Sequence, residues 1–230
     1  MRKTINKVST KILEKAIWLS IPNTKIDPTD FQNPTRRIIL NKSSEERHGT
    51  SGSYFSPKCN KRIFYESKLE FDFFTSLELS SDVIDFGFQP LKIEYKFNDY
   101  FYPYYPDFYY QLKNGSCVLG EVKKLNKMGL FLNWSKWKAM KHYCKKNGMG
   151  FLITDGKHEI RDLRNMKVNQ NLRREILELF ENSTAIDWEI IWDIKEKYKA
   201  SIKNLTCLVY QEKIKWYKQP SMFVKDKQKM

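Results

Sequence analysis

The chain has 230 residues, of which 41% are hydrophobic and 15% aromatic. This content is enough for a packed core, so the composition excludes a disordered chain, and the length suits one sizeable domain with a small appendage. Lysine and arginine outnumber aspartate and glutamate by 41 to 27, which gives a formal net charge of +14. A charge of this sign and size favours a polyanionic partner, nucleic acid before an anionic membrane surface.

The four cysteines lie far apart and form no C-x-x-C pair, which argues against a zinc site and against a disulfide framework. The apolar run near the N-terminus, AIWLSI, is too short to span a membrane and precedes no small-residue cleavage site. We therefore expect a cytoplasmic protein with reduced thiols and no membrane partner.

Residues 1–44 are polar and interrupted by prolines, and we expect an N-terminal arm with a short helix near 9–19. A loop is predicted over 48–58 from its Gly, Ser and Pro content. Apolar periodicity then predicts, in chain order, a helix over 62–79, strands over 83–88, 91–97, 105–112 and 116–123, a helix over 133–148 and a buried strand over 149–155. This order predicts an α/β domain over residues 45–160.

The pattern changes after this domain. Two amphipathic helices are expected over 171–183 and 185–199, the second with Thr184 as its N-cap, and a strand pair over 204–220. Two helices followed by a β hairpin predict a small winged-helix-like module over residues 161–230.

Charged residues lie in the hairpin of residues 105–123, where a charge costs free energy unless it is paired, bound to a metal or catalytic. Glu121 and Lys123 share one face of their strand. A two-residue loop, Asn114-Gly115, would place Asp107 opposite Val122 and on the other face. A three-residue loop from 114 to 116 would place Asp107 opposite Lys123 and on the same face. The sequence allows both registers.

Glu70 is a third acid that could reach the same place, because it lies on the apolar stripe of the predicted helix over 62–79. Carboxylate oxygens are the ligands that Mg²⁺ prefers. One ion held by Asp107, Glu121 and the main-chain carbonyl of Val122 would activate a water, and a second ion bridged through Asp107 and Glu70 would stabilise the leaving oxygen of a phosphodiester. Lys123 would orient the water and stabilise the transition state. We expect Mn²⁺ to substitute for Mg²⁺.

Simpler explanations stay open at this stage. An acid and a lysine on adjacent strands are often only an ion pair on a solvated face. The aromatic run over 100–105 either stacks on bases or packs within its hairpin. Lysines on and before the helix over 133–148 fit either a solvated face or contacts with the DNA backbone; the backbone candidates are Lys124, Lys138, Lys141 and Lys145.

The motifs of this region also resemble those of a known family. The stretch from Tyr54 to Tyr95, followed by YPDFYY and GEVKK, resembles the catalytic domain of the TnsA-type transposon endonucleases, which are restriction-endonuclease-like PD-(D/E)xK nucleases. The resemblance covers residues 45–160, and it implies a restriction-endonuclease-like mixed sheet flanked by helices. It places the catalytic positions of the family on Glu70, Asp107, Glu121 and Lys123, and it makes Gln89, in the Q-P pair, a support residue. The best-known member has glutamine at the position of Glu121.

Members of this family cut the 5′ strands at the ends of a mobile element, while a DDE-type transposase subunit cuts and joins the 3′ ends. An AAA+ ATPase regulator contacts the endonuclease. The resemblance therefore implies a Mg-dependent DNA endonuclease subunit of a heteromeric cut-and-paste transposase, acting on double-stranded transposon ends in a prokaryotic cell. The C-terminal module would dock the partners. The alternatives are a stand-alone restriction or phage-type nuclease and an inactive DNA-binding adaptor with a nuclease fold.

Overall fold

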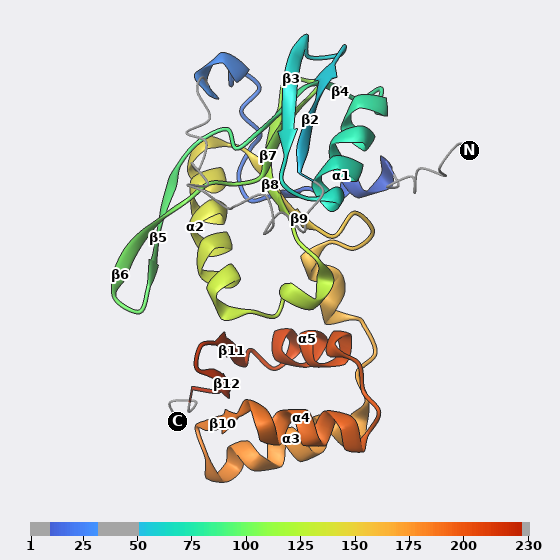
Figure 1. The fold of residues 1–230 in the computed structure, drawn as a ribbon. Helices are drawn as coiled ribbons and strands as arrows, with labels where there is room; N and C mark the ends of the chain where they lie inside the picture. The colour runs from blue at the N-terminus through green and yellow to red at the C-terminus, as the bar shows by residue number, and fades with distance from the viewer. Residues whose placement is uncertain (1–9, 32–50, 227–230) are drawn as a thin grey trace, which may run out of the picture. The chain divides into compact units, whose positions relative to one another are not determined.

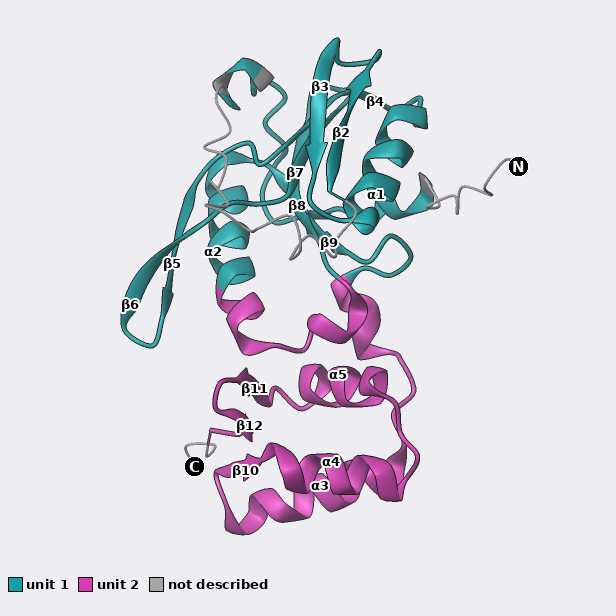
Figure 2. Ribbon diagram, viewed as in Figure 1, with its two compact units in different colours: residues 1–123, 136–159 teal, residues 124–135, 160–230 magenta. Residues whose placement is uncertain are grey.

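The computed structural model describes residues 10–31 and 51–226, so half of the predicted N-terminal arm lies outside the described residues. The chain divides into two compact units (Figure 2). The first unit contains residues 1–123 and 136–159, and the second contains residues 124–135 and 160–230. The second unit thus includes residues 124–135, which the sequence analysis assigned to the catalytic domain. Within the described ranges, every helix is too short or too polar to cross a membrane.

A five-stranded mixed sheet forms the centre of the first unit (Figure 1), and the predicted α/β class is confirmed. The strand order is β1-β9-β8-β7-β4, in which β8 pairs in parallel with β9 and antiparallel with β7. All six residues of β8 are buried, as expected for a central strand. The strands are β1 (Ile17–Trp18), β4 (Val83–Phe88), β7 (Phe108–Leu112), β8 (Cys117–Val122) and β9 (Gly150–Thr154).

Two hairpins and two helices accompany this sheet. β2 pairs with β3 and β5 pairs with β6, each as a separate two-stranded sheet. Helix α2 ends before Gly148, whose φ of +65° suits a glycine at a helix end. The elements are η1 (Thr10–Lys15), η2 (Pro28–Phe31), β2 (Gly52–Ser56), β3 (Lys61–Tyr65), α1 (Lys68–Leu79), β5 (Ile93–Phe97), β6 (Tyr100–Tyr104) and α2 (Phe131–Asn147).

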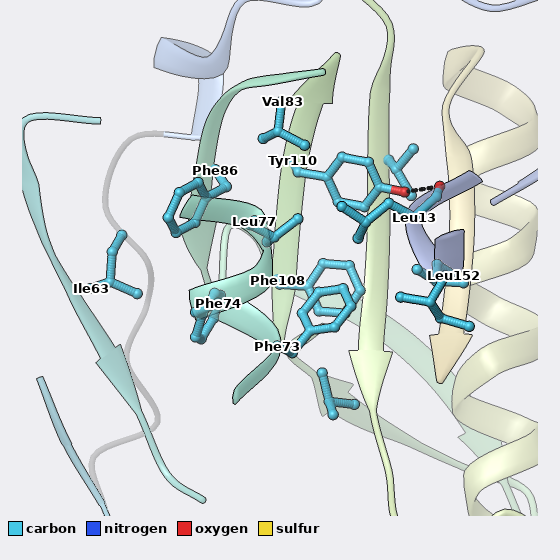
Figure 3. Close-up of a cluster of buried hydrophobic side chains, with 13 residues drawn as sticks. Leu13, Ile63, Phe73, Phe74, Leu77, Val83, Phe86, Phe108, Tyr110 and Leu152 are labelled. Atoms are coloured by element: carbon cyan, nitrogen blue, oxygen red, sulfur yellow. Dashed lines mark hydrogen bonds between the residues drawn. The ribbon is translucent and has the colours of Figure 1, made fainter. Parts of the chain in front are cut away.

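The core of the first unit lies between α1 and one face of the sheet (Figure 3). Phe73 of α1 faces Phe108 of β7, with ring centroids 4.4 Å apart. The buried Tyr110 donates its hydroxyl hydrogen bond to the carbonyl of Leu13 at 2.9 Å, so the polar group in this core is satisfied. Successive strand residues alternate between faces, and the residues that do not face α1, Glu121 among them, point to the opposite side of the sheet.

Three local predictions in the first unit are wrong. Residues 62–79 are not one helix, because β3 ends at Tyr65 and Ser67 then caps α1 by accepting a hydrogen bond from the N–H of Glu70. The expected loop over 48–58 contains the strand β2. The strand β6 was not predicted, although its exposed aromatic residues suit a strand.

The second unit contains helices and a three-stranded antiparallel sheet of order β10-β12-β11. Trp188, Trp216 and Phe223 form its aromatic core, with Trp188 stacked on Trp216 at 5.1 Å between centroids. The winged-helix interpretation of this unit remains a prediction. Its elements are η4 (Leu125–Lys127), η5 (Ile160–Arg164), α3 (Gln170–Asn182), β10 (Ala185–Asp187), α4 (Trp188–Lys197), α5 (Ile202–Gln211), β11 (Lys215–Lys218) and β12 (Ser221–Val224).

Two expectations for the second unit are wrong. The segment over 204–220 is not a strand pair, because most of α5 lies in it and only β11 is a strand. Leu205, Leu208 and Val209 bury one side of this helix, and Ser201 caps it. Thr184 does not cap α4, because β10 comes between them and Asp187 holds the N-cap position.

Gly120 provides a test of this packing, because a methyl group there would lie 2.2 Å from the carbonyl oxygen of Leu152 and 2.3 Å from the ring of Phe108. Neither neighbour can yield without moving the sheet. We expect Gly120→Ala to lower the free energy of unfolding in urea by about 2 kcal/mol or more. Gly52→Ala is the control, because a methyl there meets only the end of the Tyr65 side chain. An equal loss in both variants would contradict this account.

Candidate active site

The register of the β7–β8 hairpin places the acidic residues. Phe108 pairs with Gly120, and one further step in this register puts Asp107 opposite Glu121. Neither register considered from the sequence is correct, because the loop is residues 113–115, one residue earlier than expected. Leu112 and Ser116 close it, and Gly115 takes the left-handed position at φ +83°. Directly opposed residues share a face, so Asp107, Glu121 and Lys123 lie on the same side of the sheet.

Asp107 immediately precedes β7, and its side chain accepts a hydrogen bond from the main chain of β8. Its Oδ2 accepts the main-chain N–H of Val122 at 2.9 Å, and its own carbonyl accepts the N–H of Gln89 at 3.0 Å. Burial raises the pKa of Asp107 well above its usual value, and the neighbouring Glu121 raises it further. Lys123 and the Val122 hydrogen bond lower the pKa of Asp107, but they do not offset the rise.

Glu121 is the most buried of these acids, with 3% of its side chain exposed. Its Oε1 accepts a hydrogen bond from the ammonium of Lys123 at 2.7 Å. Its Oε2 accepts one from the indole Nε1 of Trp137 at 3.1 Å and another from the hydroxyl of Tyr104. Both carboxylate oxygens are thus compensated, as a buried charge requires.

Lys123 lies among the carboxylates and has 31% of its side chain exposed. Burial by itself lowers the pKa of Lys123, but the charges of Glu121, Asp107 and Glu70 outweigh that effect and raise the pKa above its usual value. The ammonium therefore stays charged at neutral pH, and its positive charge interacts with all three acids.

Glu70 lies in the first turn of α1, where it takes part in the N-terminal cap, and its charge acts on Asp107 and Lys123. Its carboxylate accepts hydrogen bonds from the N–H of Glu66 at 2.8 Å and from the hydroxyl of Ser67 at 2.9 Å. Burial raises the pKa of Glu70, and Lys123 is among the groups that lower it. The sequence analysis placed this residue within a longer helix, and so it missed the cap.

Gln89 follows β4 in a conformation that residues other than glycine rarely adopt, with φ at +38°. Its main-chain N–H holds the carbonyl of Asp107. Its side-chain Oε1 is buried and has no hydrogen-bond partner among the described residues. Backbone strain and an unpaired buried oxygen beside the acids are features of functional sites.

Two residues of this site were not found from the sequence. Tyr104 is 4% exposed and Trp137 is 5% exposed, and both donate to the same oxygen of Glu121. Burial and the charge of Glu121 raise the pKa of Tyr104 well above its usual value, so its hydroxyl keeps the proton that it donates. The sequence places Trp137 on the apolar stripe of its helix, but no spacing relates a helix residue to one acid on a strand.

The lysines suggested for the DNA backbone are all exposed. Lys138, Lys141 and Lys145 project from one face of α2, at the helical spacing of three and four residues. Lys124 belongs to the second unit. None of the four forms an ion pair with another residue in the described ranges.

A divalent cation at this site would meet carboxylate oxygens as its donor atoms. Within the described residues, no three acidic, histidine or cysteine side chains stand together as a ready-made metal site. The donor types and the excess of negative charge nevertheless suit Mg²⁺. Lys123 occupies Oε1 of Glu121, and the cap of α1 occupies Glu70. The oxygens that could hold a cation are therefore those of Asp107 and Glu121, and Lys123 would have to release Oε1 of Glu121.

A comparison with known protein families matches the part of the chain that carries most of the candidate site residues. Residues 80–156 match the family described as TnsA-like endonuclease N terminal. The match covers Gln89, Asp107, Glu121 and Lys123, and it includes neither Glu70 nor residues 160–230 of the second unit. No curated protein matches the chain. The resemblance inferred from the motifs is confirmed by this match, and the segment that carries Asp107, Glu121 and Lys123 is similar to the TnsA-like endonuclease N-terminal family.

Proposed function

We propose that this chain is a Mg²⁺-dependent DNA endonuclease that cuts the 5′ strands at transposon ends as a subunit of a heteromeric transposase. The observation that carries the proposal is the meeting of Asp107, Glu121 and Lys123 on one face, inside the segment that matches the TnsA-like family. The net charge of +14 supports a nucleic-acid substrate.

Asp107, Glu121 and the main-chain carbonyl of Val122 would hold one ion, and Glu70 would contribute to a second ion if it leaves its cap. Mn²⁺ would bind the same oxygen ligands. When bound, such an ion supplies an activated water and neutralises charge on the phosphate. The raised pKa of Asp107 supports this role. Burial and the nearby charge of Glu121 make the ionised form of Asp107 unfavourable, and a bound cation would stabilise that form.

Lys123 stabilises negative charge on the phosphate that reacts. In the metal-free chain it serves as the counter-ion of Glu121. Its partly exposed side chain is free to turn toward a phosphate oxygen when another cation compensates the acids. A lysine suits this exchange because its ammonium is a compact charge on a flexible stem.

Tyr104 and Trp137 hold Glu121 in place through Oε2, and this leaves Oε1 on the side of Lys123. Groups that hydrogen-bond to a metal ligand fix its orientation and raise metal affinity. Gln89 supports Asp107 in the same way through the main chain.

Lys138, Lys141, Lys145 and Lys124 would contact DNA phosphates, because exposed lysines with no partner gain affinity by releasing counterions from the duplex. The second unit would dock a DDE-type transposase subunit and an AAA+ ATPase regulator. Cleavage by the chain alone would favour a stand-alone nuclease. DNA binding without cleavage in the complete assembly would favour an inactive adaptor.

Replacing Lys123 tests the catalytic role. We expect Lys123→Ala to slow cleavage of the 5′ strand by about 10²–10³-fold, because a charge that stabilises the transition state is lost. The assay uses transposon-end DNA, Mg²⁺ and the chain assembled with its transposase subunit, and a pull-down confirms assembly. Lys68→Ala is the control, since this lysine is 68% exposed and pairs with Asp72 on the surface of α1. Cleavage by Lys123→Ala at the rate of the control would contradict the proposal.

Replacing Asp107 tests whether the raised pKa of this acid lowers the stability of the metal-free chain. Because the pKa of Asp107 is higher in the folded chain than in the unfolded chain, stability without metal falls as pH rises from the ordinary aspartate pKa of about 3.9 to the raised pKa. In EDTA at pH 7, Asp107→Asn should therefore raise the free energy of unfolding by about 1.4 kcal/mol per unit of raised pKa. It should also flatten the pH dependence measured by urea denaturation. A loss of stability at pH 7 would contradict this explanation.

Replacing Tyr104 tests the support of Glu121. We expect Tyr104→Phe to raise the Mg²⁺ concentration needed for half-maximal cleavage by about tenfold, because the ring stays and the donor to Glu121 is lost. Trp137→Phe should act in the same direction. Tyr102→Phe is the matched control, because its hydroxyl makes no hydrogen bond with another described residue. If the Mg²⁺ dependence of Tyr104→Phe equals that of the control, Tyr104 has no role in positioning Glu121.

A further inference from the structure

The hairpin β5–β6 presents large aromatic side chains to solvent. Tyr100, Phe101 and Tyr102 are 69%, 70% and 42% exposed. The hairpin pairs only with itself among the described strands, and Figure 1 shows it extending away from the central sheet of its unit. Tyr100 and Phe101 form no ring contact with any described residue. Exposed aromatic residues that adjoin one another, as these do, mark interaction sites.

The other end of the hairpin is fixed at the candidate active site. Tyr104, the last residue of β6, is buried and donates to Glu121. Its ring and that of Tyr95 lie edge to face at 6.4 Å, and the ammonium of Lys136 lies 5.8 Å from both ring centroids. The hairpin therefore has a packed base beside Glu121 and an exposed tip.

The length of β6 brings this tip within reach of a substrate at the site. Phe101 lies three residues from Tyr104, and a strand rises by about 3.3 Å per residue, so the two are about 10 Å apart. This is close to the depth of the DNA major groove, about 8.5 Å, and that groove admits a two-stranded β-ribbon. A duplex with a phosphate at Glu121 would thus have base pairs near the tip.

The chemistry of the hairpin favours contact with bases over contact with phosphates. Its charges cancel, because Lys96 pairs with Asp99 at 2.9 Å and Lys92 lies 4.0 Å from Glu94. The tip offers aromatic rings in place of unpaired positive charge. Rings of this kind stack on bases or enter between base steps as apolar wedges.

We propose that β5–β6 is a DNA-contacting ribbon whose tip, Tyr100 and Phe101, packs against bases beside the phosphate that is cut. The inference rests on the proposed function, since it takes DNA to be the molecule bound at Glu121. It adds a role in substrate contact to a segment outside the catalytic residues. The affinity from the tip is apolar and does not depend on counterion release.

The test is binding of the full-length chain to a fluorescein-labelled duplex at several salt concentrations. We expect Phe101→Ser to weaken binding by about tenfold at every salt concentration, because one base–aromatic stack is lost and no phosphate contact changes. Tyr100→Ser should act in the same direction. Phe55→Ser is the matched control, because this phenylalanine is 55% exposed in the same unit but lies on β2. It should stay within about twofold of the wild type.

A second measurement identifies the contact. A duplex that carries 2-aminopurine should brighten when the wild-type chain unstacks the base, and it should brighten less with Phe101→Ser. Unchanged binding and fluorescence in Phe101→Ser would overturn the ribbon and leave the proposed function in place. The ribbon would also be overturned if Phe101→Ser bound the duplex normally but no longer captured the transposase subunit, because the tip would then contact protein. Failure of the wild-type chain to bind any duplex would overturn the proposed function itself.

Discussion

The burial of Glu121 at the end of the central strand is the constraint on which the candidate site depends. A carboxylate that is 3% exposed is stable only if its oxygens are compensated. Three different elements supply that compensation, namely Lys123 just beyond β8, Tyr104 at the end of β6 and Trp137 on α2. The acid thereby connects the central sheet, the β5–β6 hairpin and the helix, and the position of each is tied to it.

Asp107 depends on a second constraint, which is the end of the β7–β8 ladder. On the N-terminal side of Phe108 the main chain no longer pairs with β8. The side chain of Asp107 accepts the hydrogen bond from the N–H of Val122 instead. A hydrogen-bonding requirement of the sheet thus fixes the carboxylate directly across from Glu121. Gly120 permits this geometry, because the ring of Phe108 lies where a side chain at 120 would be. The same packing that builds the core therefore brings the two acids together.

This arrangement places several carboxylates close to one another, which is unfavourable. In the metal-free chain, other groups of the first unit compensate their charge. The ammonium of Lys123 compensates the carboxylates, and the cap of α1 engages Glu70. Under the proposed function the same groups would serve a cation and a phosphate. Stability without metal and activity with metal would then depend on the same side chains. The second unit has its own aromatic core around Trp188 and Trp216 and contributes none of these groups.

The sequence by itself determined the α/β class and most of the strands of the central sheet, and it singled out the candidate acids and lysine. These features are local, because apolar periodicity and the spacing of Glu121 and Lys123 along one strand can be read without a fold. The tertiary structure decided the rest. The loop at 113–115 set the register that opposes Asp107 to Glu121, since one residue of slip changes the face of every side chain. Ser67 ended a helix that periodicity alone had extended through β3. The roles of Tyr104 and Trp137 depend on contacts between segments distant in sequence, and a pattern within one segment carries no record of them.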